Sequence, residues 1–496
     1  MFDLHSAARK AGALILVLVT ITPAFGVPPP SVNSTVDPTT ALQQRLEYLE
    51  AEVQALRGGL APSAYQSNGT TGTAPQHSST ADYVPPIADA PQPTVTPPTQ
   101  WFTPAPEKPN YPTVKVTGFF HLDSAWFDQD ANNIATLGDI QDGTGFRRAR
   151  LAATGNVTED VSYMFELDFA QAQALFVDVW MEFSDVSVLG NVRIGRFRQP
   201  FGMSELTGVR NLAFLERSTA FAFAPFRQTG IMANNTALDE HVTWAASVYR
   251  HLSDNYGNVY GDDGGWGLAS RITLLPIYVD EGEYLLHLGA DYSFNDPGRD
   301  EAQFASQDEV FVGQNPNLGP NGLDFLPLVG VPPFVNTGVI PTDDIHLFNL
   351  EAAAALGRLY LQSEARWAVV DRQNGLGTAT FPALYAQARY VLTGEKLPYS
   401  KQSATFGRIV PDDPVHFGGC GGWGAWELAG RWSYIDLNAA NLAGPGRRLN
   451  DLTLGVNWYL NGFTKFQFNY IHAFLDDPTL GDSDADTFAL RAQVDF

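Results

Sequence analysis

The last ten residues of the chain, TFALRAQVDF, alternate between apolar side chains and mostly polar ones. Phe488, Leu490, Ala492, Val494 and Phe496 fall on one side of this alternation. A period of two places successive side chains on opposite faces of a β-strand. The segment therefore predicts a strand with one wholly apolar face. If such strands recur along the chain, few folds can contain them all.

The same period returns in a series of segments between residues 114 and 496. The segments are 114–126, where the alternation slips once, and 161–169, 175–183, 284–294, 359–369, 384–392, 426–434, 452–460 and 466–470. Their apolar faces often end in Trp, Tyr or Phe, and their polar faces carry charges of both signs. These features are typical of closed barrels in lipid, which leave no strand edge unpaired. We therefore predict an all-β fold, a transmembrane antiparallel β-barrel of about 16 strands with a water-filled lumen.

The connections between these segments alternate in length. Short turns alternate with long loops rich in Gly, Asp, Pro and Asn, such as residues 295–343. Short turns at one end of the barrel and long loops at the other are typical of outer-membrane barrels. We therefore expect outer-membrane lipid to surround the apolar faces.

The N-terminal segment has the pattern of a secretory signal. Arg9 and Lys10 precede an apolar run at residues 11–21, and a small–x–small site follows at residues 24–26. Such a run is too short to span a membrane as a helix. We expect residues 1–26 to be a signal peptide cleaved near Gly26. Cys420 is the single cysteine, so no intrachain disulfide is expected.

Two further segments separate the signal peptide from the barrel. Residues 27–60 contain an a/d pattern formed by Leu42, Leu46, Leu49, Val53 and Leu56. This pattern predicts a short periplasmic coiled coil, which needs copies of itself for stability; an isolated amphipathic helix is the alternative. Residues 61–113 are rich in Pro, Ser and Thr and predict an extended linker, so the barrel domain is expected at residues 114–496.

Charge and motifs narrow the function. The formal net charge of −24 argues against nucleic acid as a partner. The chain contains no nucleophile motif, zinc-binding HExxH or phosphate loop, so we expect no enzyme activity and no cofactor. Five aspartates lie between Asp476 and Asp486, but their spacing does not match an EF-hand loop, and no metal site is predicted.

Several runs together resemble the phosphate-selective porins O and P. They are GFFHLDSAWFDQD at residues 118–130, FRRARLAATG at 146–155, YMFELDFA at 163–170, NVRIGRFRQPFG at 191–202, LERSTAFAFAP at 215–225, GGWGAWELAGRWSYIDLN at 421–438, LTLGVNWYLN at 452–461 and FALRAQVDF at 488–496. The resemblance implies a homotrimeric outer-membrane porin with 16 strands per chain. It also implies that a third extracellular loop, matching residues 196–227, folds into the lumen, where arginines attract small anions such as phosphate.

The residues themselves support an arginine path. By alternation, Arg148 and Arg150 share one face of their strand, and Arg193 lies opposite Val192 and Ile194. Arginine is always charged and offers paired donors that match phosphate oxygens. The predicted anion pathway consists of Arg148, Arg150, Arg193, Arg196, Arg198, Arg210, Arg217 and Arg227, with the last five placed in the inward loop.

The same alternation leaves an alternative open. Five more arginines fall on the polar face, namely Arg271, Arg366, Arg389, Arg431 and Arg491, together with the carboxylates Glu166, Asp168, Asp178, Glu182, Asp291, Glu351, Glu364 and Glu427. Arginines that pair with these carboxylates would only hold the wall, and the channel would be general or cation-preferring. Two alternatives come from other functional classes: a structural barrel that tethers the outer membrane to the cell wall, and an outer-membrane enzyme such as a lipase barrel. We predict a passive diffusion channel for small hydrophilic solutes, with inorganic anions preferred.

Overall fold

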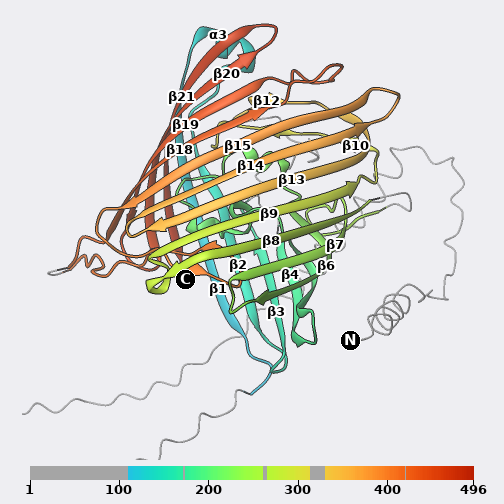
Figure 1. Cartoon of the computed structure of the whole chain (residues 1–496). Helices are drawn as coiled ribbons and strands as arrows, with labels where there is room; N and C mark the ends of the chain where they lie inside the picture. The colour runs from blue at the N-terminus through green and yellow to red at the C-terminus, as the bar shows by residue number, and fades with distance from the viewer. Residues whose placement is uncertain (1–109, 171–173, 261–264, 313–329, 419–420) are drawn as a thin grey trace, which may run out of the picture. The chain divides into compact units, whose positions relative to one another are not determined.

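The computed structural model describes residues 110–170, 174–260, 265–312, 330–418 and 421–496. The predicted signal peptide, the coiled coil and nearly all of the linker lie outside these ranges. In the described part of the chain, 16 long antiparallel strands close into a barrel (Figure 1). The prediction of the fold class is confirmed.

Each barrel strand pairs with the next one along the chain. The strands are β1 (Lys115–Gln129), β2 (Gly143–Asn156), β3 (Val161–Asp168), β4 (Leu175–Val186), β5 (Gly190–Arg198), β6 (Arg227–Ala237), β7 (Val242–Arg250), β8 (Trp266–Val279), β9 (Tyr284–Asp296), β13 (Ile340–Leu356), β14 (Leu359–Arg372), β15 (Gly377–Val391), β18 (Ala425–Asp436), β19 (Arg448–Tyr459), β20 (Thr464–Asp477) and β21 (Gly481–Asp495). The barrel closes where β1 pairs with β21, from Phe119 opposite Asp495 to Gln129 opposite Ala485.

The two faces of the wall follow the alternation of the sequence. On β21, Phe488 and Leu490 are exposed on the outer face, whereas Arg491 and Gln493 are buried inside. Aromatic side chains meet on the outer face near strand ends; Trp426 stacks on the Trp458 ring with centroids 5.2 Å apart. Apolar side chains outside and charged side chains inside are the inverse of a soluble β-sandwich.

The predicted faces are wrong at the start of β4. Strict alternation along residues 175–183 places Leu175 and Val177 on one apolar face with Met181 and Phe183, but the first two are buried and the last two are exposed. The pairing of β3 with β4 shifts register between these two pairs of residues. A β-bulge adds one residue to a strand and moves the following side chains to the opposite face.

Three long connections fold inward in the parts that the structure describes, which for the second and third leave out residues 313–329 and 419–420. The inner loop (residues 199–226) joins β5 to β6 and contains α4 (Met203–Leu206), η1 (Val209–Asn211) and η2 (Thr219–Phe223). The roof loop (residues 297–339) joins β9 to β13 and contains β10 (Glu301–Ala302), β11 (Ala305–Ser306) and β12 (Val335–Asn336). The floor segment (residues 392–424) joins β15 to β18 and contains β16 (Tyr399–Ser400) and β17 (Thr405–Phe406). Elsewhere, α3 (Ala131–Leu137) follows β1 and η3 (Asp280–Gly282) precedes β9.

The floor segment corrects the predicted loop pattern. It begins at the end of the barrel where the Leu392 N–H donates to the Trp426 carbonyl. The short turns predicted for one end of the barrel, such as residues 357–358, lie at this same end. Long connections are therefore present at both ends of the barrel. A chain passing into the lumen needs apolar partners there, and the floor segment supplies Leu397, Phe406 and Ile409.

Apolar side chains from the three connections form the core inside the barrel. Phe201 and Phe223 of the inner loop belong to one buried cluster with Phe304 and Phe334 of the roof loop. Met203 of the inner loop belongs to a second cluster with the three apolar residues of the floor segment. The inner loop is therefore held between the other two connections.

None of the helices in the described ranges is long and apolar enough to cross a membrane. The residues described also contain no group of three or more His, Cys, Asp or Glu side chains placed to hold a metal ion.

Candidate functional site

The inner loop crosses the lumen and binds the opposite wall. Three consecutive backbone N–H groups at the start of α4 donate to carboxylates on three adjacent strands, namely Gly202 to Asp291 (2.8 Å), Met203 to Glu351 (2.5 Å) and Ser204 to Glu364 (2.6 Å). Backbone N–H groups at the start of a helical turn have no partner within the turn and favour negative charge. These wall carboxylates therefore hold the inner loop rather than face the solute.

Two arginines bind the other end of the same turn. Arg198 donates to the Thr207 carbonyl at 3.0 Å, and Arg217 donates to the Ser204 and Thr207 carbonyls at 2.6 Å each. Cationic groups at the C-terminal end of a helical turn complete the charge pattern that the carboxylates begin. Both residues were predicted as anion-path arginines, and in the structure their donors are used to fix the loop.

A second cluster forms around Glu216 of the inner loop. Its carboxylate binds Arg147, Arg148 and Arg491 at 2.9, 2.9 and 2.8 Å. Arg491 also binds Asp123 at 2.6 Å, which joins β21 to β1 across the closing pair of strands. All five side chains are buried, so the cluster contains three positive and two negative groups with little access to solvent.

The Arg147–Arg148 pair depends on a β-bulge. His121 lies opposite Arg148, but Leu122 lies opposite Phe146, so Arg147 is the extra residue of β2. Strict alternation would direct one of two consecutive arginines into lipid, where a charge is costly. The bulge turns both inward. Sequence reasoning missed Arg147, although two adjacent arginines in a membrane strand are themselves a sign of a bulge.

Six other strand arginines form ion pairs within the wall. Arg150 binds Asp168 at 2.7 Å and Arg227 binds Asp178 at 2.9 Å. The other pairs are Arg193–Glu182 (2.8 Å), Arg271–Glu351 (2.7 Å), Arg366–Glu364 (2.7 Å) and Arg389–Glu427 (2.7 Å). Alternation predicted the inward face of these residues correctly, except for Arg227, which was predicted in the loop. It did not determine whether they pair with each other or with a solute.

The other predicted residues occupy different parts of the lumen. Arg196 donates to Ser253 at 2.7 Å, and Arg210 lies in η1 with 44% of its side chain exposed, 3.8 Å from Asp495. Arg196, Arg198 and Arg227 were predicted in the loop, but the first two belong to β5 and the third begins β6. The correction arises because β5 and β6 continue pairing up to Arg198 opposite Arg227.

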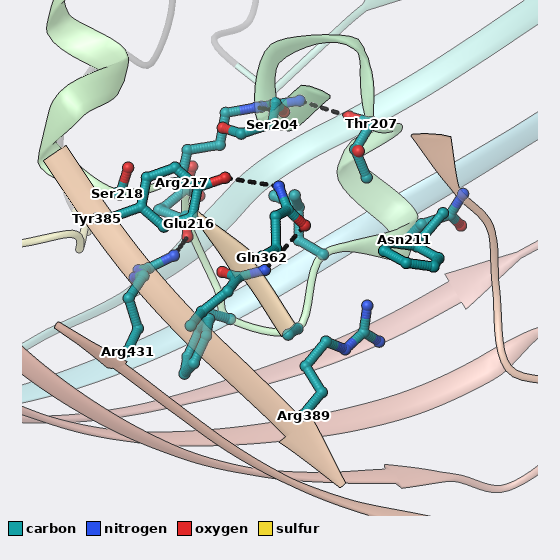
Figure 2. A pocket seen from close by; sticks show the side chains of 15 residues that line it. Ser204, Thr207, Asn211, Glu216, Arg217, Ser218, Gln362, Tyr385, Arg389 and Arg431 are labelled. Carbon is teal, nitrogen blue, oxygen red and sulfur yellow. Dashed lines mark hydrogen bonds between the residues drawn. The ribbon is translucent and has the colours of Figure 1, made fainter. Parts of the chain in front are cut away.

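A small cavity lies between the inner loop and strands β14, β15 and β18. Its volume is about 20 Å³, which is sufficient for one water molecule. Arg217, Arg389 and Arg431 line it, and Glu216 is the one carboxylate among its lining residues. Figure 2 shows Arg389 and Arg431 extending from the wall towards the segment that carries Glu216 and Arg217, with Arg431 bound to the Glu216 carbonyl (3.1 Å).

The roof loop and the floor segment each bind inner side chains of the wall, on different strands. Glu309 of the roof loop accepts hydrogen bonds from Arg431 and from Ser433 and Thr453. Arg271 donates to the Ser403 carbonyl of the floor segment at 2.9 Å. These contacts occupy donors of β8, β18 and β19 and hold both connections inside the barrel.

A family model described as "Phosphate-selective porin O and P" matches residues 114–496. The chain belongs to this family. This porin is therefore a channel of the outer membrane, and the family consists of channels rather than enzymes. The match spans all 16 barrel strands and the three inward connections.

Two relatives show how far the similarity extends. Porin O of Pseudomonas aeruginosa is 26% identical to this porin over 382 residues, which cover 72% of this chain and 83% of the relative. An uncharacterized protein of Caulobacter vibrioides is 26% identical over 480 residues, which cover 89% and 88% of the two chains.

Solved barrels are more distant. The outer membrane channel DcaP of Acinetobacter baumannii superposes with a TM-score of 0.47 at 11% identity, over 77% of this porin and 97% of that chain. The trimer form of OmpT of Vibrio cholerae superposes with a TM-score of 0.45 at 11% identity, over 77% and 99%.

Proposed function

We propose that this porin passes small anions by passive diffusion, with inorganic phosphate as a preferred solute. The charge of the cavity beside the inner loop carries the proposal, because three arginines and one carboxylate line it. Arg389 and Arg431 are each paired with one carboxylate, Glu427 and Glu309, whereas Glu216 and Asp123 together bind three further arginines. Arg217 binds backbone carbonyls instead of a carboxylate, so positive charge remains in excess around the cavity. The description of the family as phosphate-selective supports phosphate as the solute.

The proposed path combines arginines that are already bound to protein groups with arginines that are partly exposed. Arg217, Arg389 and Arg431 supply positive potential at the cavity, while Arg193 and Arg210 are partly exposed. Arginine is weakly hydrated and matches phosphate oxygens with two donors. Several moderate sites in sequence allow an anion to enter and leave without being trapped.

The test is the zero-current potential of the purified porin in a planar bilayer under a KCl gradient, repeated with phosphate added. We expect chloride preference and a reduction of the chloride current by phosphate. Cation preference without any effect of phosphate would mean that the lumen carboxylates prevail and that the channel is a general porin.

A matched pair of variants locates the effect in the lumen. Arg389→Gln should lower the ratio of chloride to potassium permeability by about three- to tenfold, because one charge is lost beside the passage. Arg448→Gln is the control, since Arg448 is also paired with a carboxylate, Asp476, but is exposed at the end of β19. Equal effects of the two variants would exclude the cavity as the selective region.

We further propose that the porin is a homotrimer. Large apolar side chains are exposed on the outer face of neighbouring strands, including Phe165, Met181, Ile194 and Ile231 on β3 to β6, and part of this surface is available for contact between copies. The molar mass of the detergent-solubilised porin, measured by light scattering with the detergent contribution subtracted, distinguishes a trimer from a monomer.

A further inference from the structure

Glu205 of α4 is a buried carboxylate without a hydrogen-bond partner. Its exposed fraction is 0%, and both carboxylate oxygens lack a donor. The wall carboxylates beside α4 differ, because Glu351 and Glu364 each accept from a backbone N–H and from an arginine. A carboxylate that is buried without partners is usually neutral or compensated by nearby positive charge.

The surroundings of Glu205 are positively charged. Four arginines from four different elements act on it, namely Arg366 of β14, Arg198 of β5, Arg217 of the inner loop and Arg227 of β6. None of the four donates to the Glu205 carboxylate, although Arg198 and Arg217 donate to its backbone carbonyl. The carboxylate is therefore near the arginines but forms no hydrogen bond with them, so its charge changes their field without changing their contacts.

The negative groups near α4 are already compensated. Asp291, Glu351 and Glu364 face the first residues of α4 and bind its backbone N–H groups. Asp178 on β4 is bound to Arg227. Among these carboxylates around α4, Glu205 is the one in which neither oxygen accepts a hydrogen bond.

Glu205 is also close to the cavity. Its chain neighbour Ser204 lines the cavity, and Arg217, one of the lining arginines, donates to the Glu205 carbonyl at 3.1 Å. Coulomb interactions between buried groups decay slowly in a medium of low dielectric constant. A change of charge on Glu205 therefore alters the potential at the cavity.

We propose that Glu205 is a residue that determines the ion selectivity of this porin: its ionised form offsets the positive field of Arg198, Arg217 and Arg366 at the cavity, and its neutral form leaves that field intact. This inference rests on the proposed anion path. Burial raises the pKa of Glu205 to about 7, so both forms are populated near neutral pH. Anion preference is then higher below neutral pH than above it.

The experiment compares the full-length wild-type porin with Glu205→Gln, using the zero-current potential in a KCl gradient at about pH 5.5 and about pH 8.5. For wild type, we expect the ratio of chloride to potassium permeability to fall by about three- to tenfold between the lower and the higher pH. For Glu205→Gln, we expect the high ratio at both pH values.

A control is needed because a second buried carboxyl group titrates in the same range. Burial raises the pKa of Asp308 on the roof loop to about 7 as well, and Asp308 accepts from Thr487 rather than facing the four arginines. Asp308→Asn should keep the pH dependence of the wild type. Loss of the pH dependence in this control, or its retention in Glu205→Gln, would overturn the inference.

The test of Glu205 does not depend on the folding of one variant or on which ion the wild type prefers. If Glu205→Gln does not form barrels, Glu205→Met, which has similar volume and no charge, provides the same comparison. If wild type prefers cations at both pH values, the proposed anion function fails, but a shift of Glu205→Gln towards anions at high pH still supports the role of Glu205. An unchanged potential at high pH contradicts that role whichever ion is preferred.

Discussion

The two halves of the barrel wall differ in how their inner faces are used. On β3 to β5 many inner side chains are partly exposed, although Asp168 and Arg196 are buried, and the Arg193–Glu182 pair leaves 26% and 14% of the two side chains accessible. On β13 to β15 and β18 to β21 the inner face is almost wholly buried beneath the inward connections, as with Glu364 and Arg491. The covered half uses most of its charges to hold loops, with Arg389 and Arg431 also lining the cavity of the proposed anion path, and the open half keeps charges accessible to ions.

This difference separates two roles for the same residue type. An arginine on the covered half contributes mainly to stability, because removing its partner leaves a buried charge. An arginine on the open half is screened by water and contributes little to stability but can influence ions directly. Substitutions on the two halves should therefore differ in their effects on stability and on selectivity.

Glu216→Gln should cause the largest loss of stability. The substitution leaves Arg147, Arg148 and Arg491 without one shared carboxylate, and breaking a buried ion pair costs about 3–5 kcal/mol. Unfolding by denaturant in detergent, followed by tryptophan fluorescence, measures the loss. A loss below about 1 kcal/mol would show that the cluster is solvated and that the two halves do not differ.

Gly202→Ala should have an intermediate effect. Gly202 has φ of +76°, and an added Cβ would lie 2.2 Å from Arg366 Nη2 and 2.6 Å from Glu364 Oε2. Backbone strain of this kind costs about 1–3 kcal/mol. We expect a matching loss of stability together with increased noise in single-channel recordings, because the inner loop loses its fixed position.

Gly208→Ala is the control for this substitution. Gly208 lies in the same loop with a negative φ, and the atom nearest to its added Cβ is at 3.6 Å. Quiet channels and unchanged stability are expected. If Gly202→Ala behaves like this control, the contacts of α4 with the covered wall do not position the loop.

Arg193→Gln should have the smallest effect on stability and a visible effect on selectivity. Its partly exposed pair with Glu182 contributes less than about 1 kcal/mol. Loss of a positive charge from the open half should lower the ratio of chloride to potassium permeability, by up to about threefold. Glu182→Gln should shift the ratio in the opposite direction, and a shift of both variants in one direction would contradict an ion path along this wall.

Sequence alone predicted the strands of the wall but not the bulges within them. Alternation identified the strands and the inward direction of residues such as Arg150, Arg366 and Arg431, because a period of two is fixed by strand geometry. It did not identify the bulges that turn Arg147 inward and move Val177 off the outer face, because a bulge is one inserted residue with no periodic signal.

The contacts of the inward connections were also beyond sequence reasoning. Glu205, Glu216 and Glu309 lie in segments without periodicity, so nothing in the sequence placed them opposite wall arginines. The floor segment had the composition of an external connection, and the apolar residues that bury it are separated along the chain. These contacts depend on which strands become neighbours after the barrel closes.

The ion pair between Asp123 and Arg491 has a consequence for the order of assembly. The two residues are separated by 368 positions and join the first barrel strand to the last. Until β21 is in place, β1 and the growing sheet both present open edges, which are prone to wrong pairing. Contacts at such separation form slowly. The barrel therefore closes only when β21 pairs with β1, and until then the edge of β1 has to be protected from wrong pairing.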